Sequence, residues 1–338
     1  MTRYSRFWTR LANVPAIVKL ILIVNPVLYL FYGTRFNGFN YAVVTVEDNS
    51  LPRPANVYCR GCTIKDLQII MGDDICYTYR EQDTDLLVLL FTTHQNVEAR
   101  NALRETWLSD SNDGPEGRIR HAFLIGRSNN HTLETLIQEE NDIHNDIVQG
   151  DFVDSYYNLT TKTMLGLKWF RTRCPNAKYI LKTDDDVYVN IPGLKDLIST
   201  YSHLLETSVA GTCFLNITPD RNVNSKWYVS EEEYPKKTYP GYCSGTGYLL
   251  SANAANQIAA VSATVPYFYL EDVYIGFCVS KLGYKFTVLP GFHSATSRPI
   301  DCRYKSESVV TSHRIAPDIQ RKIWNMPCSV SYFYHYLM

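Results

Sequence analysis

The sequence predicts an α/β fold with a mainly parallel sheet flanked by helices, and three observations support this. Short apolar runs recur along the chain, segments of helical period separate them, and an acidic cluster directly follows one of the runs. Such runs are typical of strands buried on both faces, and their alternation with helices is typical of βαβ units. Ligands bind at the carboxyl ends of such strands, so we expect a site at the acidic cluster.

The elements follow one another in a regular order. The run DLLVLLFTT at residues 85–93 predicts a buried strand, and residues 97–108 predict a helix because apolar residues recur there at helical spacing. No G-x-G-x-x-G follows the first strand, so the dinucleotide-binding fingerprint is absent. The later elements are expected as strand, helix, strand, helix and a strand running into an acidic turn, at residues 118–126, 131–144, 146–156, 159–174 and 177–190.

Length and charge limit the function classes. The chain has 338 residues, which corresponds to one large domain or two small ones. It carries 33 Lys and Arg against 34 Asp and Glu, a formal net charge of −1. Because there is no basic excess, nucleic acid is not the expected partner.

Cysteines and glycosylation sequons point to an oxidising compartment. The nine cysteines are spread along the whole chain, which is typical of disulfide-bonded proteins of the secretory pathway. Cys59 and Cys62 form a lone C-x-x-C without a second pair at zinc-ligand spacing. The count is odd, so at least one cysteine is free or pairs with another chain. Three N-x-[ST] sequons begin at Asn130, Asn158 and Asn216.

The N-terminus predicts a membrane anchor. Residues 14–32 form an apolar segment close to the length that spans a bilayer, and arginines without acidic residues precede it. The positive-inside rule then places residues 1–13 in the cytoplasm and the rest in a lumen. A cleaved signal peptide and a buried core helix are the alternatives. Residues 33–82, with prolines and turn signals, are expected to be a lumenal stem, and residues 83–338 the catalytic domain.

The acidic cluster is Asp184, Asp185 and Asp186, between the apolar runs YIL and VYV. Adjacent carboxylates repel one another, and a cation relieves that repulsion. A D-x-D at a strand end can bind a divalent ion and leave positions free for water and diphosphate oxygens. A solvated acidic turn is the alternative interpretation.

Two further features are candidates for the site. Glu271 and Asp272 lie between apolar runs. Burying a carboxylate there costs free energy unless the group is paired or has a function in the site. One of them is a candidate general base, and a capping or salt-bridged pair is the alternative. Arg100 and Arg104 are four residues apart and therefore share one face of the predicted helix.

The chain resembles the β-1,3-galactosyltransferases, glycosyltransferase family 31, over residues 83–328. The resemblance is specific because eight blocks occur in the same order. They are RNALRETW (100–107), FLIG (123–126), DFVDSYYNLTTKT (151–163), YILKTDDDVYVN (179–190), KWYVS (226–230), YPGYCSGTGYLLS (239–251), LEDVYIGFC (270–278) and HRIAPDIQRKIWN (313–325).

This resemblance implies a GT-A fold and a reaction that inverts the anomeric carbon of the donor sugar. Asp184, Asp185 and Asp186 match the D-x-D that binds manganese and the diphosphate of UDP, with Asp186 as the expected direct ligand. His313 matches the histidine that completes the metal site, and His293 in GFHSA fits less well.

The resemblance also assigns the base and the nucleotide half. Asp272 matches the catalytic base. Arg100 and Arg104 fall in the nucleotide half, where they are expected either to contact the nucleotide or to form structural ion pairs.

The function implied is transfer of galactose from UDP-galactose in β-1,3 linkage to an acceptor glycan on a glycoprotein or glycolipid. The block YPGYCSGTGYLLS resembles the galactosyl members, although Gly241 replaces the second proline of their YPPY. A transferase of N-acetylglucosamine or N-acetylgalactosamine and an inactive glycan-binding relative are the alternatives. The family also implies a single-pass type II protein of the Golgi membrane with a lumenal catalytic domain.

Overall fold

The structure is a computed structural model that describes residues 43–44, 67–72, 75–76, 84–109, 119–295 and 299–328. The predicted tail and anchor, residues 1–32, and the C-x-x-C motif lie outside these residues. Within the part of the chain that is described, no helix is long and apolar enough to cross a membrane.

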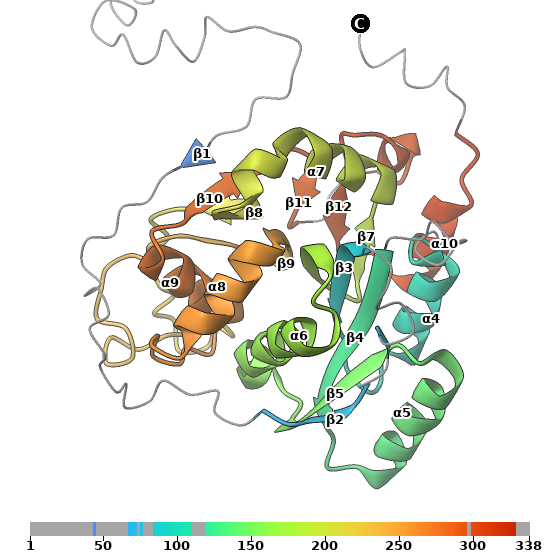
Figure 1. Cartoon of the computed structure of the whole chain (residues 1–338), viewed down its shortest axis with the longest axis horizontal. Helices are drawn as coiled ribbons and strands as arrows, with labels where there is room; N and C mark the ends of the chain where they lie inside the picture. Colours follow the sequence, from blue (N-terminus) through green and yellow to red (C-terminus); the bar gives the residue numbers. More distant parts are fainter. Residues whose placement is uncertain are drawn as a thin grey trace, which may run out of the picture. The chain divides into compact units, whose positions relative to one another are not determined.

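A large sheet forms the centre of the described structure (Figure 1). Among the described residues it has nine strands in the order β1-β10-β8-β9-β6-β3-β4-β5-β2, and a second sheet has the order β11-β12-β7. The bounds are β1 Val43–Val44, β2 Ile69–Met71, β3 Thr84–Phe91, β4 Ile119–Arg127, β5 Ile147–Val153, β6 Ala177–Asp184, β7 Val187–Val189, β8 Ser208–Phe214, β9 Tyr242–Ser251, β10 Lys285–Val288, β11 Phe292–His293 and β12 Thr311–His313.

The α/β class is confirmed, but the sheet is mixed. Strands β5, β4, β3 and β6 at its centre run parallel, as predicted. The prediction of a mainly parallel sheet is wrong beyond β6, because β9 runs antiparallel to both β6 and β8. The chain returns from β8 to the neighbouring β9 through a long loop without a crossover helix, and such a connection gives an antiparallel pair.

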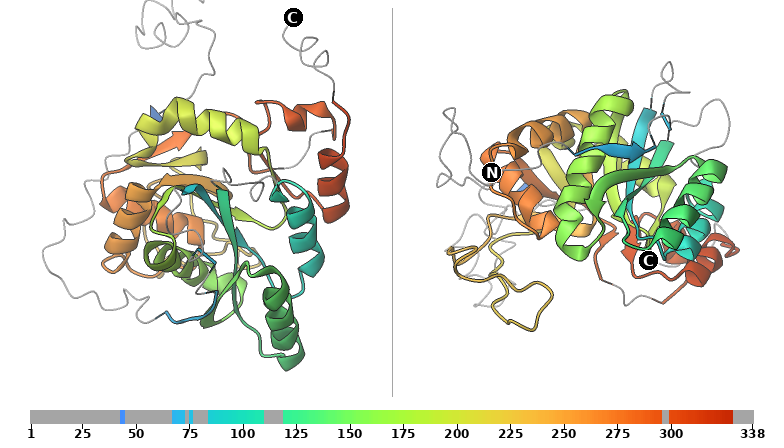
Figure 2. Two further views of the ribbon diagram at one scale, coloured as in Figure 1. Left: turned by 45° about the vertical axis from the view of Figure 1, so that its right-hand side comes forward. Right: turned by 90° about the horizontal axis from the view of Figure 1, so that it is seen from below.

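Helices cover both faces of the large sheet (Figure 2). Helices α6, α8 and α9 contact one another on one face, and α4, α7 and α10 contribute to the core on the other face. The bounds are α4 Val97–Glu105, α5 His131–His144, α6 Leu159–Arg173, α7 Ile191–Leu205, α8 Ala252–Ser262, α9 Glu271–Lys281 and α10 Pro317–Trp324, with short 3-10 helices at Tyr156–Asn158 and Cys302–Lys305.

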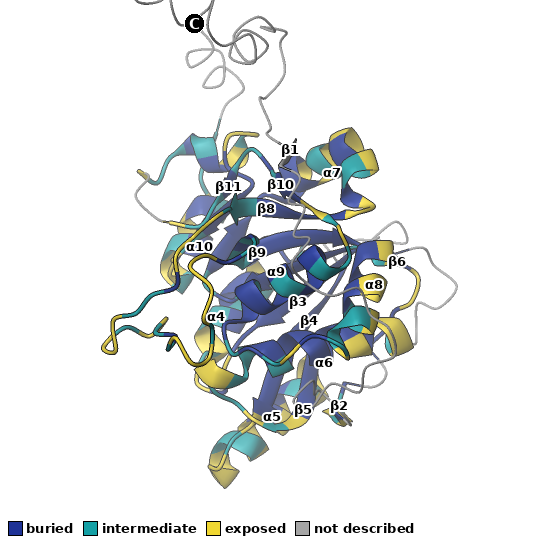
Figure 3. Cartoon of the chain, turned by 90° about the vertical axis from the view of Figure 1, so that its left-hand side faces the viewer, coloured by how far each residue is buried: buried dark blue, intermediate teal, exposed yellow. Residues whose placement is uncertain are grey.

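The apolar run of β3 explains why the large sheet has a hydrophobic core on each of its two faces. Leu87 and Leu89 belong to the core beneath α6, α8 and α9, whereas Leu86 and Val88 belong to the opposite core. Successive side chains of a strand point to opposite faces, so a strand buried on both sides is apolar throughout. The burial colours show the central strands enclosed between exposed outer helix faces (Figure 3).

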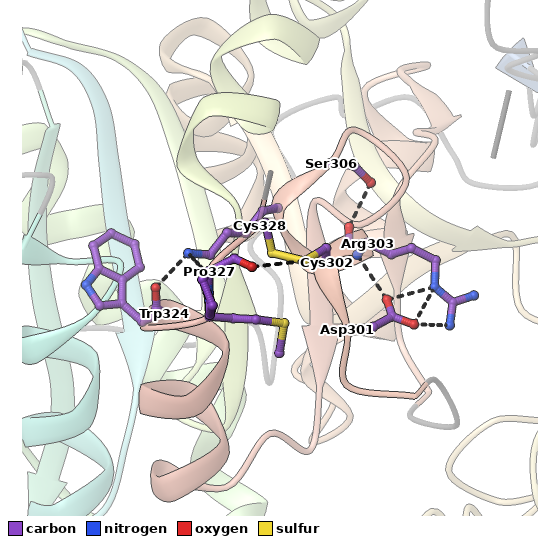
Figure 4. The surroundings of a disulfide bond; sticks show 9 residues. Asp301, Cys302, Arg303, Ser306, Trp324, Pro327 and Cys328 are labelled. Carbon is purple, nitrogen blue, oxygen red and sulfur yellow. Dashed lines mark hydrogen bonds and ion pairs between the residues drawn. A yellow bond between two sulfur atoms is a disulfide. The ribbon is translucent and has the colours of Figure 1, made fainter. Parts of the chain in front are cut away.

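Among the described residues, three disulfides connect distant segments. Cys76 bonds Cys174 and thereby attaches part of the predicted stem to the end of α6, and β2 from the same segment pairs with β5. A second bond, Cys213 to Cys243, joins β8 to β9. The third joins Cys302 to Cys328 beyond α10, beside the ion pair of Asp301 and Arg303 (Figure 4). Cys278 is buried and has no disulfide partner among the described residues.

Candidate active site

A pocket of about 520 Å³ lies where the four parallel central strands end. The expectation that a site would form at these carboxyl ends is therefore met by an open cavity, and several of its lining residues are polar or charged. The lining residues are 91–96 after β3, 127–129 after β4, 153–156 after β5 and 184–186 after β6, together with Leu159, Lys162 and His313.

Asp184, Asp186 and His313 converge at the edge of this pocket. One ligand atom from each of the three lies within 4.8 Å of the others, and His313 Nε2 is 3.3 Å from an Asp186 carboxylate oxygen. Burial lowers the pKa of the His313 ring, but the bond to Asp186 and its charge, the Ser294 carbonyl and the charge of Asp184 together raise the pKa overall. Two carboxylates and an imidazole are a donor set that suits manganese or zinc.

Strand pairing brings His313 to the acidic turn across more than a hundred residues of sequence. Strand β12 pairs antiparallel with β7 in a register that sets His313 opposite Val187, the residue after Asp186. The backbone N–H of Ile315 also donates to the carbonyl of Asp186 at 2.8 Å. The other ring nitrogen of His313 bonds the Ser294 carbonyl at 3.1 Å, which fixes the ring plane.

Asp185 is buried and is not one of the three possible metal ligands. Its carboxylate accepts hydrogen bonds from the Thr92 hydroxyl at 2.6 Å and from the Asn96 amide at 2.8 Å. Burial raises the pKa of Asp185 to about 6 against the effect of these two donors. Asp185 therefore fastens the turn after β6 to the loop after β3, two of the segments that line the pocket.

Arg100 lies beneath the pocket, with no exposed surface. Its guanidinium makes two bonds to Glu140, at 2.7 and 2.6 Å, and donates to the Thr93 carbonyl at 2.6 Å. It also bonds the Thr92 hydroxyl at 3.1 Å, the same hydroxyl that bonds Asp185. Arg100 thus supports the loop after β3 from below.

Arg104, one helical turn further on, belongs to the same buried network. It bonds both carboxylate oxygens of Asp146 at 2.8 Å and lies 2.7 Å from Glu140. The network links α4, α5 and the start of β5, so the two arginines on one helix face tie together the elements beside the pocket.

Glu271 and Asp272 begin α9, and the structure gives them different surroundings. Glu271 is buried and accepts bonds from the Tyr248 hydroxyl at 2.6 Å and the Thr163 hydroxyl at 2.8 Å, while burial raises its pKa to about 7. Asp272 is partly exposed and accepts the backbone N–H of Gly245 at 3.2 Å. Burial also raises the pKa of Asp272.

Lys182 connects the three possible metal ligands to this carboxylate pair. We refer to these ligands, Asp184, Asp186 and His313, as the metal group. Its ammonium bonds Asp184 at 2.7 Å, lies 4.0 Å from Glu271 and donates to the carbonyl of Gly245. The N–H of that same Gly245 donates to Asp272. Burial lowers the pKa of Lys182, but Asp184 and Glu271 outweigh burial and raise it overall. One buried cation therefore contacts both halves of the site.

The sequence interpretation missed Lys182 and also the buried pair of Lys162 and Asp154. Lys162 bonds both oxygens of Asp154, at 2.9 and 3.0 Å, and the Thr92 carbonyl at 2.7 Å. A lysine inside the apolar strand YILKTD was the available signal for Lys182, because an ammonium group is buried only with partners. The sequence spacing of Asp154 and Lys162 does not predict that they form an ion pair.

The fold and the site have the features of an enzyme for a small-molecule substrate: a polar pocket lies at the carboxyl ends of the parallel strands, and three possible metal ligands lie at its edge. The pocket is large enough for a small-molecule substrate, and its edge offers metal ligands. The buried Glu271 carboxylate lies 4.0 Å from the Lys182 ammonium, which also pairs with Asp184.

Sequence comparisons identify the family. The family described as Galactosyltransferase matches residues 98–290, and the chain belongs to it. The chain is 39% identical to beta-1,3-galactosyltransferase 1 of Homo sapiens over 240 residues, 71% of this chain and 73% of that protein. It is 35% identical to beta-1,3-galactosyltransferase 5 of Pan paniscus over 248 residues, 72% of this chain and 81% of that protein. The chain is therefore a glycosyltransferase.

Structural comparisons give more distant similarities. The apo structure of the bifunctional glycosyltransferase WbbM aligns with a TM-score of 0.40 and 11% identity, over 75% of this chain and 52% of that one. The galactosyltransferase LgtC, in complex with donor and acceptor sugar analogues, aligns with a TM-score of 0.37 and 10% identity, over 73% of this chain and 99% of that one.

We predict that Lys182→Met lowers turnover by about 10²-fold, because small misplacements of reacting groups are costly. The substitution keeps an apolar stem but removes the cation that Asp184 and Glu271 share. The measurement is kcat of the purified variant, with its thermal unfolding recorded to confirm that it folds. Lys178→Met on the same strand is the control, because Lys178 forms an exposed pair with Asp85 and should be dispensable. Turnover in Lys182→Met as high as in the control Lys178→Met would contradict a role for Lys182.

Proposed function

We propose that the protein transfers galactose from UDP-galactose in β-1,3 linkage to an acceptor glycan, with inversion at the anomeric carbon. The observation that carries the proposal is the convergence of Asp184, Asp186 and His313 beside the pocket, with the Asp272 carboxylate held separately at the start of α9. Relatives at 39% and 35% identity are named as beta-1,3-galactosyltransferases, which supports this donor and this linkage. We assign the mixed sheet with its flanking helices to the GT-A type.

The donor is proposed to occupy the pocket with its diphosphate toward the acidic turn. Asp184, Asp186 and His313 fit a divalent ion, and we propose Mn²⁺. When bound, that ion stabilises the negative charge that develops on the leaving diphosphate. Asp185 supports this site through its hydrogen bonds to Thr92 and Asn96.

Arg100 and Arg104 are proposed to serve the nucleotide half indirectly. Arg100 has no exposed surface, and its donors are bonded to Glu140 and to the loop after β3. That loop, residues 92–96, lines the pocket. The arginines therefore contribute to the nucleotide site by fixing the position of the loop that lines it.

Asp272 is proposed to be the general base. The acceptor hydroxyl oxygen attacks the anomeric carbon of the donor, the bond from that carbon to the UDP oxygen breaks, and the proton moves to an Asp272 oxygen. The raised pKa of Asp272 suits a carboxylate that must take a proton. Glu271 is unsuited to this role, because it is buried and its carboxylate is occupied by Tyr248 and Thr163.

The alternatives are a transferase of N-acetylglucosamine or N-acetylgalactosamine and an inactive glycan-binding relative. The intact metal group and the positioned Asp272 oppose the inactive alternative. UDP release from the three UDP-sugars, with manganese and a panel of acceptor glycans, tests the proposal. We expect the highest rate with UDP-galactose, and a higher rate with either N-acetylhexosamine donor would contradict it.

The cellular setting is proposed from the sequence. Residues 14–32 are proposed to anchor a single-pass type II protein in the Golgi membrane, with the catalytic domain in the lumen. The disulfides of the catalytic domain support an oxidising lumen.

We predict that Asp186→Ala and His313→Ala each weaken the binding of UDP in the presence of Mn²⁺ by at least about tenfold. Even outer-shell partners of metal ligands are worth about 10–100-fold in metal affinity. Calorimetric titration of UDP with and without Mn²⁺ is the measurement. His293→Ala is the matched control, because His293 bonds the Ser308 carbonyl and lies outside the metal group. Unchanged UDP affinity in His313→Ala would move the metal site elsewhere.

We predict that Asp272→Asn lowers turnover by about 10²–10⁴-fold, the usual contribution of a general base. Donor and metal bind without the base, so the affinity for UDP with Mn²⁺ should survive. Glu271→Gln is the control, because the amide can still accept from Tyr248 and Thr163 and should retain most of the activity. If Glu271→Gln is inactive while Asp272→Asn is active, Glu271 is the base.

We predict N-glycans at Asn130 and Asn216 and little or none at Asn158. Asn130 is exposed and caps α5 through its side-chain oxygen, which leaves its amide nitrogen available, and Asn216 is exposed on the loop after β8. The amide nitrogen of Asn158 donates to the Val153 carbonyl at 2.8 Å. Mass spectrometry of protein from a secretory host measures occupancy at each site, and full occupancy at Asn158 alone would be the opposite result.

A further inference from the structure

A group of aromatic side chains lies beside the pocket, and of its members only Tyr156 lines the pocket proposed to hold the donor. The group comprises the exposed residues Tyr156, Tyr157 and Trp227 and the half-buried Tyr269, and we refer to it as the aromatic surface. Tyr157 is 65% exposed, Trp227 52% and Tyr156 38%. Large aromatic rings at such exposure cost free energy in water unless a partner covers them, and grouped apolar surface of this kind marks binding sites.

The aromatic surface is assembled from three segments that are distant in sequence. The Tyr156 and Tyr157 ring centroids are 6.1 Å apart, and those of Tyr157 and Tyr269 are 5.4 Å apart. The Tyr269 hydroxyl donates to the carbonyl of Tyr228, the neighbour of Trp227. Each ring is thus held in contact with the next segment.

Backbone contacts fix these segments in place. The Tyr267 hydroxyl donates to the Tyr157 carbonyl at 2.8 Å, and the Thr160 hydroxyl donates to the Phe268 carbonyl at 2.7 Å. On the loop between β8 and β9, the guanidinium of Arg221 donates to the carbonyls of Val229 and Ser230, both at 2.7 Å. The aromatic surface is therefore preorganised, which reduces the entropic cost of binding.

Tyr156 links the aromatic surface to the reacting centre. It lines the pocket that also includes Asp184 and Asp186. Tyr269 precedes Asp272 by three residues in the segment that leads into α9. Burial raises the pKa of Tyr156 to about 12, and the charges of Asp272 and Asp184 add to this rise. The rings therefore begin where donor pocket and base meet and extend outward from there.

We propose that the aromatic surface binds the acceptor glycan, with its terminal sugar at Tyr156 and the preceding sugar stacked on Tyr157 and Trp227. This rests on the proposed transferase function and adds a substrate class, namely glycans of at least two sugars. The C–H face of a hexose is apolar and matches an aromatic ring, while its hydroxyls stay in water. The rings extend beyond Tyr156, so a single sugar at the base would leave Tyr157 and Trp227 uncovered.

Lys226 contributes a polar group to the same surface. Its ammonium lies 4.8 Å from the Trp227 ring centroid and 5.7 Å from that of Tyr156. These cation–π contacts hold the two rings in a fixed relation, and an ammonium beside them can donate hydrogen bonds to sugar hydroxyls.

The test compares methyl glycosides of one acceptor sugar with those of a di- and a trisaccharide ending in the same sugar. UDP-galactose and Mn²⁺ are kept saturating, and initial rates give the acceptor KM. For the wild type we expect a lower KM for the disaccharide than for the monosaccharide. In Trp227→Ala and in Tyr157→Ala, the disaccharide KM should rise about tenfold, the size of one ring contact. The monosaccharide KM and the KM for UDP-galactose should stay within about twofold.

Two variants separate ring stacking from general damage. Trp227→Phe retains a ring and should recover most of the disaccharide affinity. Val223→Ala, at a residue 70% exposed on the same loop, should behave as the wild type. Unchanged disaccharide KM in both alanine variants, or equal losses for monosaccharide and disaccharide, would overturn the proposal and leave galactosyl transfer intact.

One further outcome distinguishes this proposal from the proposed function on which it rests. A wild type that transfers galactose to no member of the series counts against the proposed function. In that case disaccharide binding by saturation-transfer NMR still decides the role of the aromatic surface, because binding that survives both alanine substitutions excludes it.

Discussion

The site depends on holding several carboxylates close together. Asp184 ends β6 with Asp185 and Asp186 directly after it, and residues 271–272 begin α9. Two acidic groups therefore meet around one buried ammonium, that of Lys182. Like charges at such separations are tolerated only with counter-charges or hydrogen bonds. The Lys182 ammonium supplies a counter-charge to both groups. The Asp185 carboxylate instead accepts hydrogen bonds from two neutral side chains. Asp184 and Asp186 are left facing His313, and this arrangement favours a divalent cation.

The fold meets this requirement with two sheets. The parallel strands of the large sheet end together and open the pocket, which is the usual place for a ligand in an α/β fold. The small sheet brings β12 from near the C-terminus against β7, so His313 reaches an acidic turn formed more than a hundred residues earlier. Buried ion pairs of Arg100 and Arg104 support the pocket wall, and the site is thus stiff before any substrate arrives.

The sequence predicted local features well and spatial relations poorly. The strand and turn around residues 177–190 and the position of Asp184 at a strand end followed from the apolar pattern, and both are confirmed. His313 joined the metal group through family resemblance alone, because no local pattern predicts which strands pair. The inward turn of Asp185 and the burial of Arg100 depend on packing between β3, α4 and α5, which residue spacing does not encode. The antiparallel direction of β9 was missed because the apolar pattern of a buried strand is the same whether the strand runs parallel or antiparallel to its neighbours.

The central claim is that Asp184, Asp186 and His313 share one metal ion that holds the diphosphate of UDP in the pocket. A crystal structure of the protein with UDP and manganese, with diffraction recorded at the manganese absorption edge, tests it most directly. We expect a single anomalous peak bonded by Asp186 and His313, with Asp184 beside it and the diphosphate in contact with the ion. A manganese peak held by other residues, or UDP bound in this pocket with no ion at these three side chains, would contradict the account.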